Sequence, residues 1–155
     1  MKIGAGWDSH EFRAGVPCRI GGIDLPHDRG LAGHSDGDVL LHALTDALLG
    51  AVAAGDIGTH FPPSDARWKN ADSAQFVAAA LERVRQAGYR VANVDSTLIL
   101  SAPRITPHAA AMQKRIAELL GIQPEAVSVK AKTPEGIPTE NAAIAQVVVL
   151  LKPIE

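Results

Sequence analysis

The chain has 155 residues, of which 46% are hydrophobic and 21% charged, and its 15 basic and 17 acidic residues give a net charge of −2. These values are typical of a folded soluble domain, and they exclude disorder, collagen and a coiled coil as descriptions of the whole chain. The weak net charge gives no indication that nucleic acid or an anionic membrane is bound. We therefore expect a single domain over residues 1–155, with no nucleic-acid partner and no membrane partner.

Two features bear on the compartment in which the protein works. The N-terminal residues lack the apolar run of a secretory signal, and the most apolar stretch, residues 39–54, is shorter than the ~20 residues that a membrane span needs. Cys18 is the only cysteine, so no disulfide can form within the chain. Both observations favour a reducing, cytoplasmic location.

Strand and helix signals follow one another along the chain. We expect two strands, two helices, a strand, a helix and two strands, over residues 2–7, 19–25, 36–54, 73–87, 93–100, 107–120, 127–133 and 144–151. Ser35 or Asp36 is expected to cap the first helix and Asp72 the second, the third begins at Pro107, and each helix stops before a glycine. Residues 146–151 are nearly all apolar, which is typical of a strand buried on both faces. This order predicts an α+β domain with helices packed on one face of a mixed β-sheet.

The first candidate site lies at the end of the first predicted strand, in the sequence Gly-Ala-Gly-Trp-Asp-Ser-His over residues 4–10. Residues two apart in an extended chain project to the same face, so Asp8 and His10 can converge on one point. Both side chains are good ligands for zinc. The pattern Asp-x-His is common, however, and a turn with a polar tip is the alternative.

The second candidate site lies on the first predicted helix, where Asp38, His42 and Asp46 form a polar stripe at i, i+4 and i+8. A stripe facing solvent is one explanation. The leucines around it predict instead a helix buried on most sides, whose polar groups then need partners. A metal ion bound by His42 would satisfy that need. Asp8, His10 and His42 together provide three ligands and leave one position open, as in catalytic zinc sites.

Other segments offer groups for a phosphorylated ligand. His34 and Ser35 precede a helix start, where free N–H groups and the helix dipole attract anions. Asp56 lies among glycines, residues 101–106 separate a strand from a helix, and residues 132–135 combine a cation, a hydroxyl and a carboxylate. Taken singly, each segment is better explained by ordinary turn chemistry.

Taken together, these segments resemble the 2-C-methyl-D-erythritol 2,4-cyclodiphosphate synthase family of the non-mevalonate isoprenoid pathway. The resemblance covers nearly the whole chain and is carried by GAGWDSH at residues 4–10, HSDGDVLLHALTDALLGA at 34–51, GDIGTHFPPSD at 55–65, NVDSTLILSAPRITPH at 93–108 and VKAKTPE at 129–135. It implies a homotrimer with active sites between adjacent subunits. Each site would be a phosphorus–oxygen lyase that converts 4-diphosphocytidyl-2-C-methyl-D-erythritol 2-phosphate into the 2,4-cyclodiphosphate and CMP.

The resemblance also implies roles for individual residues. Asp8, His10 and His42 would bind one zinc ion (Zn²⁺) per subunit, and Glu135 would help to hold Mg²⁺ or Mn²⁺ on the substrate diphosphate. His34 and Thr133 match the catalytic positions that stabilise the transition state. The implied substrate-binding residues are Asp8, Ser9, His10, His34 and Ser35, then Asp56, Ile57, Gly58, Phe61, Ser64 and Asp65, then Leu100, Ser101, Ala102, Pro103, Arg104, Ile105 and Thr106, and finally Lys132, Thr133, Pro134 and Glu135. Residues 56–58 would meet the ribose, residues 101–106 the cytosine, and residues 34–35 and 61–65 the methylerythritol phosphate.

The chain departs from this family at three places. Pro63 replaces a usual acidic residue, so Asp65 would carry more of that loop's contacts. Lys132 and Pro134 replace small polar residues, and the family's Gly-aromatic-x-Gly-Arg stretch after Glu135 is absent. Two alternative functions stay open: a zinc-dependent nucleotide-diphosphate hydrolase, and a non-catalytic trimeric protein that binds metal or nucleotide.

Overall fold

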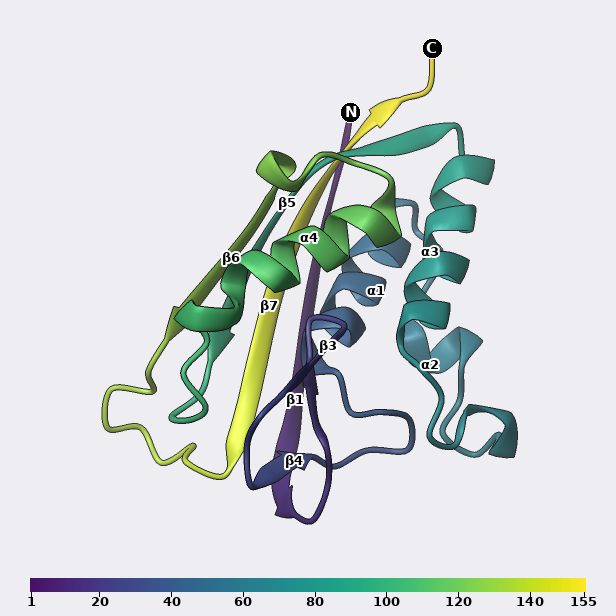
Figure 1. Cartoon of the computed structure of the whole chain (residues 1–155). Helices are drawn as coiled ribbons and strands as arrows, with labels where there is room; N and C mark the ends of the chain where they lie inside the picture. Colours follow the sequence, from purple (N-terminus) through teal and green to yellow (C-terminus); the bar gives the residue numbers. More distant parts are fainter.

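A mixed five-stranded sheet with the strand order β4-β1-β7-β5-β6 forms the framework of the computed structural model of the chain (Figure 1). Its strands are β1 (Lys2–Ala14), β4 (Arg29–Leu31), β5 (Tyr89–Ile99), β6 (Val127–Lys132) and β7 (Ala142–Pro153). All neighbouring strands are antiparallel except β5 and β6, which are parallel. A separate hairpin consists of β2 (Cys18–Ile20) and β3 (Ile23–Leu25).

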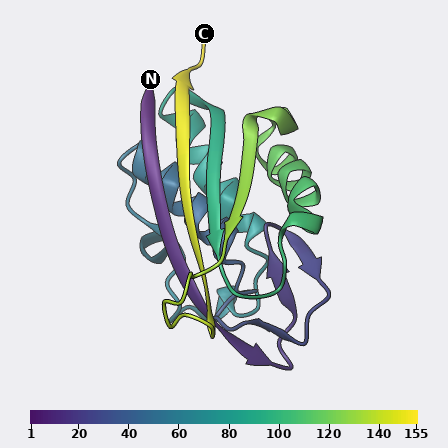
Figure 2. The same cartoon turned by 90° about the vertical axis from the view of Figure 1, so that its left-hand side faces the viewer.

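The helices cover one face of this sheet, as predicted, and Figure 2 looks onto the opposite face with helices behind the strands. They are α1 (Val39–Ala51), α2 (Ile57–His60), α3 (Ala74–Gln86) and α4 (Ala109–Leu120), with 3₁₀ turns at Ala66–Trp68, Thr106–His108 and Pro124–Ala126. None of them is long and apolar enough to cross a membrane. The α+β class with helices on one face is therefore confirmed.

The N-terminal third of the fold differs from the prediction in its strands. Strand β1 continues to Ala14 because it pairs first with β7 and then, from Phe12, with β4. Asp8 and His10 consequently lie within the strand and not at its end. The strand predicted over residues 19–25 is a hairpin, because Gly21 and Gly22 adopt the left-handed φ values of 67° and 75° that suit glycine.

The helix starts also differ in detail. Helix α1 begins at Val39, and its cap is Asp38, whose side chain accepts from Leu41 N; neither Ser35 nor Asp36 caps it. Asp38 is fully buried and also accepts from Gly21 N and Gly22 N, at 2.9 and 2.7 Å. It therefore ties the β2–β3 hairpin to α1 and is not part of a polar stripe on that helix.

Strand β7 was expected to be buried on both faces, and that prediction is wrong for the single chain. Ala143, Ala145, Val147, Val149 and Leu151 are completely buried beneath the helices, whereas the residues between them are only half-buried or exposed. The second face of the sheet is open. Ile3 and Trp7 of β1 are exposed there by 70% and 60%, and Gln146 of β7 and the ion pair of Asp95 with Lys130 lie on the same face.

Strand β1 packs very closely against helix α1. A Cβ atom on Gly4 would lie 2.0 Å from the carbonyl oxygen of Ala47, and one on Gly6 would lie 1.8 Å from that of Ala43. Both distances are far below van der Waals contact, so only glycine allows the two backbones to approach this closely. Helix α1 is buried at 11 of its 13 residues, as its leucine content predicts.

The substitution Gly6→Ala tests this contact. The added methyl group must push α1 away from β1, and overpacking of this kind costs about 1–3 kcal/mol or more in the free energy of unfolding. Gly50→Ala, in helix α1, is the matched control. A Cβ atom added there would meet nothing closer than the carbonyl oxygen of Ala5, at 4.0 Å. Alanine there should be neutral or stabilising by up to ~1 kcal/mol. Denaturant unfolding of both variants measures the difference, and equal midpoints would contradict the packing argument.

Candidate active site

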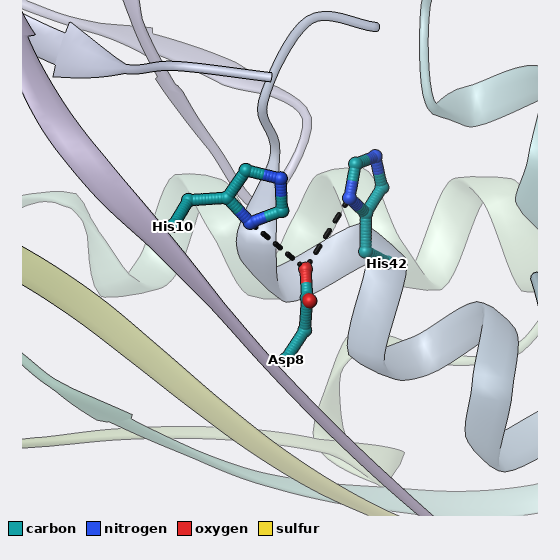
Figure 3. A group of neighbouring side chains, drawn as sticks. All are labelled: Asp8, His10 and His42. Carbon is teal, nitrogen blue, oxygen red and sulfur yellow. Dashed lines mark ion pairs between the residues drawn. The ribbon is translucent and has the colours of Figure 1, made fainter. Parts of the chain in front are cut away.

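Asp8, His10 and His42 form a compact cluster where β1 faces α1 (Figure 3). Asp8 and His10 share the face of β1 that carries Gly4 and Gly6, since residues two apart in a strand point the same way. Their ligand atoms and that of His42 all lie within 4.8 Å of one another. Asp8 Oδ2 is 3.0 Å from His10 Nδ1 and 3.3 Å from His42 Nδ1.

The donor set of this cluster fits a metal ion such as zinc. Asp8 Oδ2 and His10 Nδ1 are both buried, and neither has a hydrogen-bond partner of acceptable geometry. Such buried polar atoms need a partner. Burial alone would raise the pKa of Asp8, but the two histidines hold that pKa below its usual value, so the carboxylate form is favoured. Two imidazole nitrogens and one carboxylate oxygen make three ligands, the number found in catalytic zinc sites.

A cavity of about 300 Å³ opens beside this cluster. It brings two of the candidate metal ligands together with most of the residues predicted for the methylerythritol and ribose ends of the substrate: His10, His34, Ser35, His42, Ile57, Gly58 and Phe61. Trp68 and Phe76, which were not predicted to be site residues, also line the cavity, and their ring centroids lie 5.0 and 4.5 Å from that of Phe61. Nothing in their spacing relates these aromatic residues to a site.

Helix α2, which sequence analysis did not predict, forms one wall of this cavity. Asp56 caps it by accepting from Thr59 N and Thr59 Oγ1, both at 2.8 Å. Asp46 accepts from Ile57 N at 2.7 Å. The carboxylate of Asp46 therefore anchors the wall of the cavity, and it is not among the three clustered ligand residues.

Asp65, which is expected to carry more of its loop's contacts because Pro63 replaces an acidic residue, makes several contacts within the chain. Its carboxylate caps the turn at Ala66–Trp68 and pairs with Arg67 at 2.6 Å. Only its backbone carbonyl meets a predicted site residue, by accepting from His34 Nε2 at 3.0 Å. Pro63 itself lines the cavity, whereas Ser64 and Asp65 do not.

Most of the residues predicted for the cytidyl end line a second cavity, of about 180 Å³, between the end of β5 and the end of β6. They are Leu100, Ser101, Pro103, Arg104, Ile105, Thr106, Lys132 and Thr133. Ala102, Pro134 and Glu135 are not among its lining residues. Thr133 Oγ1 donates to Glu135 Oε1 at 2.7 Å, so these two side chains lie together at its edge.

The two cavities are well separated within one chain. In the sheet, Ser9 pairs with Ile144, Ile144 with Ile99, and Ile99 with Lys132. Three strand spacings, or roughly 14 Å, therefore lie between the strand that carries the metal cluster and the end of β6. The structure of a single chain does not bring Thr133 and Glu135 to Asp8, His10 and His42.

Comparisons with known proteins place this arrangement in a family. The model of the YgbB family matches residues 1–152. The chain is 61% identical over 152 residues to the 2-C-methyl-D-erythritol 2,4-cyclodiphosphate synthase of Koribacter versatilis, a match that covers 98% of both chains. It is 55% identical over 137 residues to the enzyme of the same name from Salinibacter ruber, covering 88% of this chain and 87% of the relative.

Solved structures give the same result. A 2C-methyl-D-erythritol-2,4-cyclodiphosphate synthase superposes with a TM-score of 0.91 at 39% identity, covering 97% of this chain and 99% of the other. The bifunctional IspDF of Campylobacter jejuni has a TM-score of 0.95 at 36% identity, with 99% of this chain matched to 42% of that protein. A CDP complex of Plasmodium falciparum IspF has a TM-score of 0.87 at 30% identity, covering 99% and 97%. The chain therefore belongs to the YgbB family, the family of the 2-C-methyl-D-erythritol 2,4-cyclodiphosphate synthases.

Proposed function

We propose that this protein converts 4-diphosphocytidyl-2-C-methyl-D-erythritol 2-phosphate into 2-C-methyl-D-erythritol 2,4-cyclodiphosphate and CMP. The observation that carries the proposal is the cavity that joins His10 and His42 to His34 and Ser35, in a chain that matches named synthases over nearly its whole length. CDP-bound relatives in the solved structures support a cytidyl substrate. The cytoplasm is the proposed location.

The reaction asks little covalent chemistry of the protein. An oxygen of the substrate's own 2-phosphate attacks the β-phosphorus, the bond from that phosphorus to the bridging oxygen breaks, and CMP leaves with the bridging oxygen. Positioning and charge neutralisation dominate such phosphoryl transfers. No side-chain nucleophile is needed, and burial raises the pKa of the Cys18 thiol to about 11, which makes it a poor one.

Two groups of residues are proposed to hold metal ions. Asp8, His10 and His42 would bind zinc, and Glu135 would help to bind Mg²⁺ or Mn²⁺ on the diphosphate. When bound, these ions supply positive charge that polarises the β-phosphate and offsets the charge between the α- and β-phosphates.

The other residues have proposed roles in binding and orienting the substrate. His34 and Ser35 would bind the phosphate end beside the metal cluster, and residues 56–58 the ribose. Residues 100–106, with Lys132 and Pro134, would enclose the cytidyl group. His34 and Thr133 would stabilise the transition state by donating hydrogen bonds to the charge that develops on phosphate oxygens.

A homotrimer is the proposed assembly, because one chain holds the two halves of the site apart. In a cyclic trimer, the metal-binding half of one subunit can face the cytidyl-binding half of the next, and the ring closes without unpaired halves. The open face of the sheet supports this assembly. Ile3 and Trp7 are exposed there beside the half-buried Val148 and Leu150, and an apolar patch of this kind is typical of a protein interface.

Product analysis tests the proposed reaction. The purified protein, supplied with the cytidyl substrate, zinc and magnesium, should release CMP and the cyclic diphosphate in equal amounts, as measured by ³¹P NMR. Release of CMP with an uncyclised phosphate would identify a zinc-dependent hydrolase instead. Tight cytidyl binding without any turnover would identify a binding protein.

The variant His42→Ala tests the metal site. Loss of one of three protein ligands should leave a site that no longer retains zinc through purification, and turnover should fall with the metal content. The fold should survive, because removal of the imidazole opens space toward the cavity. His108→Ala is the control, since His108 lines neither cavity. Metal analysis that finds undiminished zinc in His42→Ala, with full activity, would contradict the assignment.

A further inference from the structure

The side of the His42 ring that faces away from Asp8 is held by a buried serine. His42 Nε2 lies 2.7 Å from Ser73 Oγ and 3.0 Å from Ser35 Oγ. Ser73 is completely buried. Its hydroxyl donates to Asp36 Oδ1 at 2.5 Å, and its backbone N–H donates to Asp36 Oδ2 at 2.8 Å. Asp36, Ser73 and His42 therefore form a connected chain of polar groups that ends at the metal cluster.

The positions of the hydrogens in this chain follow from the chemistry of its members. A carboxylate can only accept, so the hydrogen between Ser73 and Asp36 belongs to the Ser73 hydroxyl. A contact of 2.7 Å between Ser73 Oγ and His42 Nε2 also needs a hydrogen, and only the imidazole can supply it. His42 thus carries its hydrogen on Nε2, which leaves a lone pair on Nδ1, the nitrogen that faces Asp8.

The Ser73 hydroxyl is not used to cap helix α3. It occupies the N-cap position of α3, but its side chain makes no capping hydrogen bond. Asp72 Oδ1 accepts from Ala74 N at 2.9 Å in its place. Asp36 Oδ1 also accepts from Asp38 N at 3.1 Å, and Asp36 Oδ2 lies 3.5 Å from Arg19 Nε. The carboxylate that holds the Ser73 hydroxyl is therefore fixed in position.

We propose that Ser73, held by Asp36, is a positioning residue that fixes His42 in the tautomer and orientation needed to bind metal through Nδ1. The proposal rests on the metal-binding role of His42 proposed above. Outer partners of this kind fix the ring of a ligating histidine and raise its basicity, and their loss typically costs 10–100-fold in metal affinity.

Zinc affinity, measured by competition with a fluorescent chelator, tests the proposal. Ser73→Ala should bind zinc about 10–100-fold more weakly than the parent, while its metal-free form keeps the parent's circular dichroism spectrum. Ser96→Ala is the matched control. Ser96 is equally buried, but its hydroxyl donates to Ser128 O at 2.7 Å in the sheet, far from the cluster. Ser96→Ala should bind zinc like the parent. Equal affinity of Ser73→Ala and the parent would overturn the proposal.

A second measurement needs no variant at Ser73. In the ¹⁵N-labelled, metal-free parent above pH 8, the ¹⁵N chemical shifts of His42 should show a protonated Nε2 and an unprotonated Nδ1. A hydrogen on Nδ1 would overturn the inferred hydrogen placement. The proposed metal site and the proposed role of Ser73 would fail in different ways. If the parent and His42→Ala bind zinc equally, the metal site itself is wrong. If His42→Ala loses zinc affinity and Ser73→Ala does not, only the role of Ser73 is contradicted.

Discussion

The contact between the backbones of β1 and α1 is the constraint on which the candidate site depends. Gly6 meets the carbonyl of Ala43, the residue that follows His42, and Asp8 and His10 continue from Gly6 along the same face of β1. The separation of the two backbones therefore sets the distance between His42 and its two partners. A side chain at Gly6 would widen that separation, and the three ligand atoms would no longer converge. Gly4 and Gly6 are therefore as necessary to the site as Asp8 and His10, which follow them in the same motif.

Much of this arrangement could be predicted from local signals in the sequence. Leucine density and the glycines that follow the helices located the long helices to within a few residues, and the two-residue spacing of Asp8 and His10 placed them on one face of a strand. His42 could be joined to them because a histidine on a buried helix needs a partner. The helices and the pairing of Asp8 with His10 follow from spacings of at most a few residues, over which the geometry of strands and helices is fixed; the link to His42 followed from chemistry and not from spacing.

What could not be predicted depends on contacts between distant segments. Strand β4 has only three residues and exists because β1 offers it a partner. Ser73 and Asp36 are 37 positions apart, so no spacing rule relates them. The pairing of the Asp65 carboxylate with Arg67, two residues away, has no signal in the sequence that predicts it. The apolar run in β7 was interpreted as burial on both faces; apolar composition does not distinguish a face covered by helices from one left open in the single chain.

We propose that one active site takes its zinc ligands from one subunit and its cytidyl-binding residues, with Glu135, from the next. The most direct test is co-expression of His42→Ala and Glu135→Gln, two variants expected to have low turnover, carrying different affinity tags. In every mixed trimer, one of the three sites should combine an intact zinc half with an intact cytidyl half, because a closed ring of two kinds of subunit contains one junction in each order. Activity in the doubly tagged trimers should therefore rise well above that of either variant alone. If each chain carried a complete site of its own, every site would hold one defect, and mixed trimers no more active than the separate variants would contradict the account.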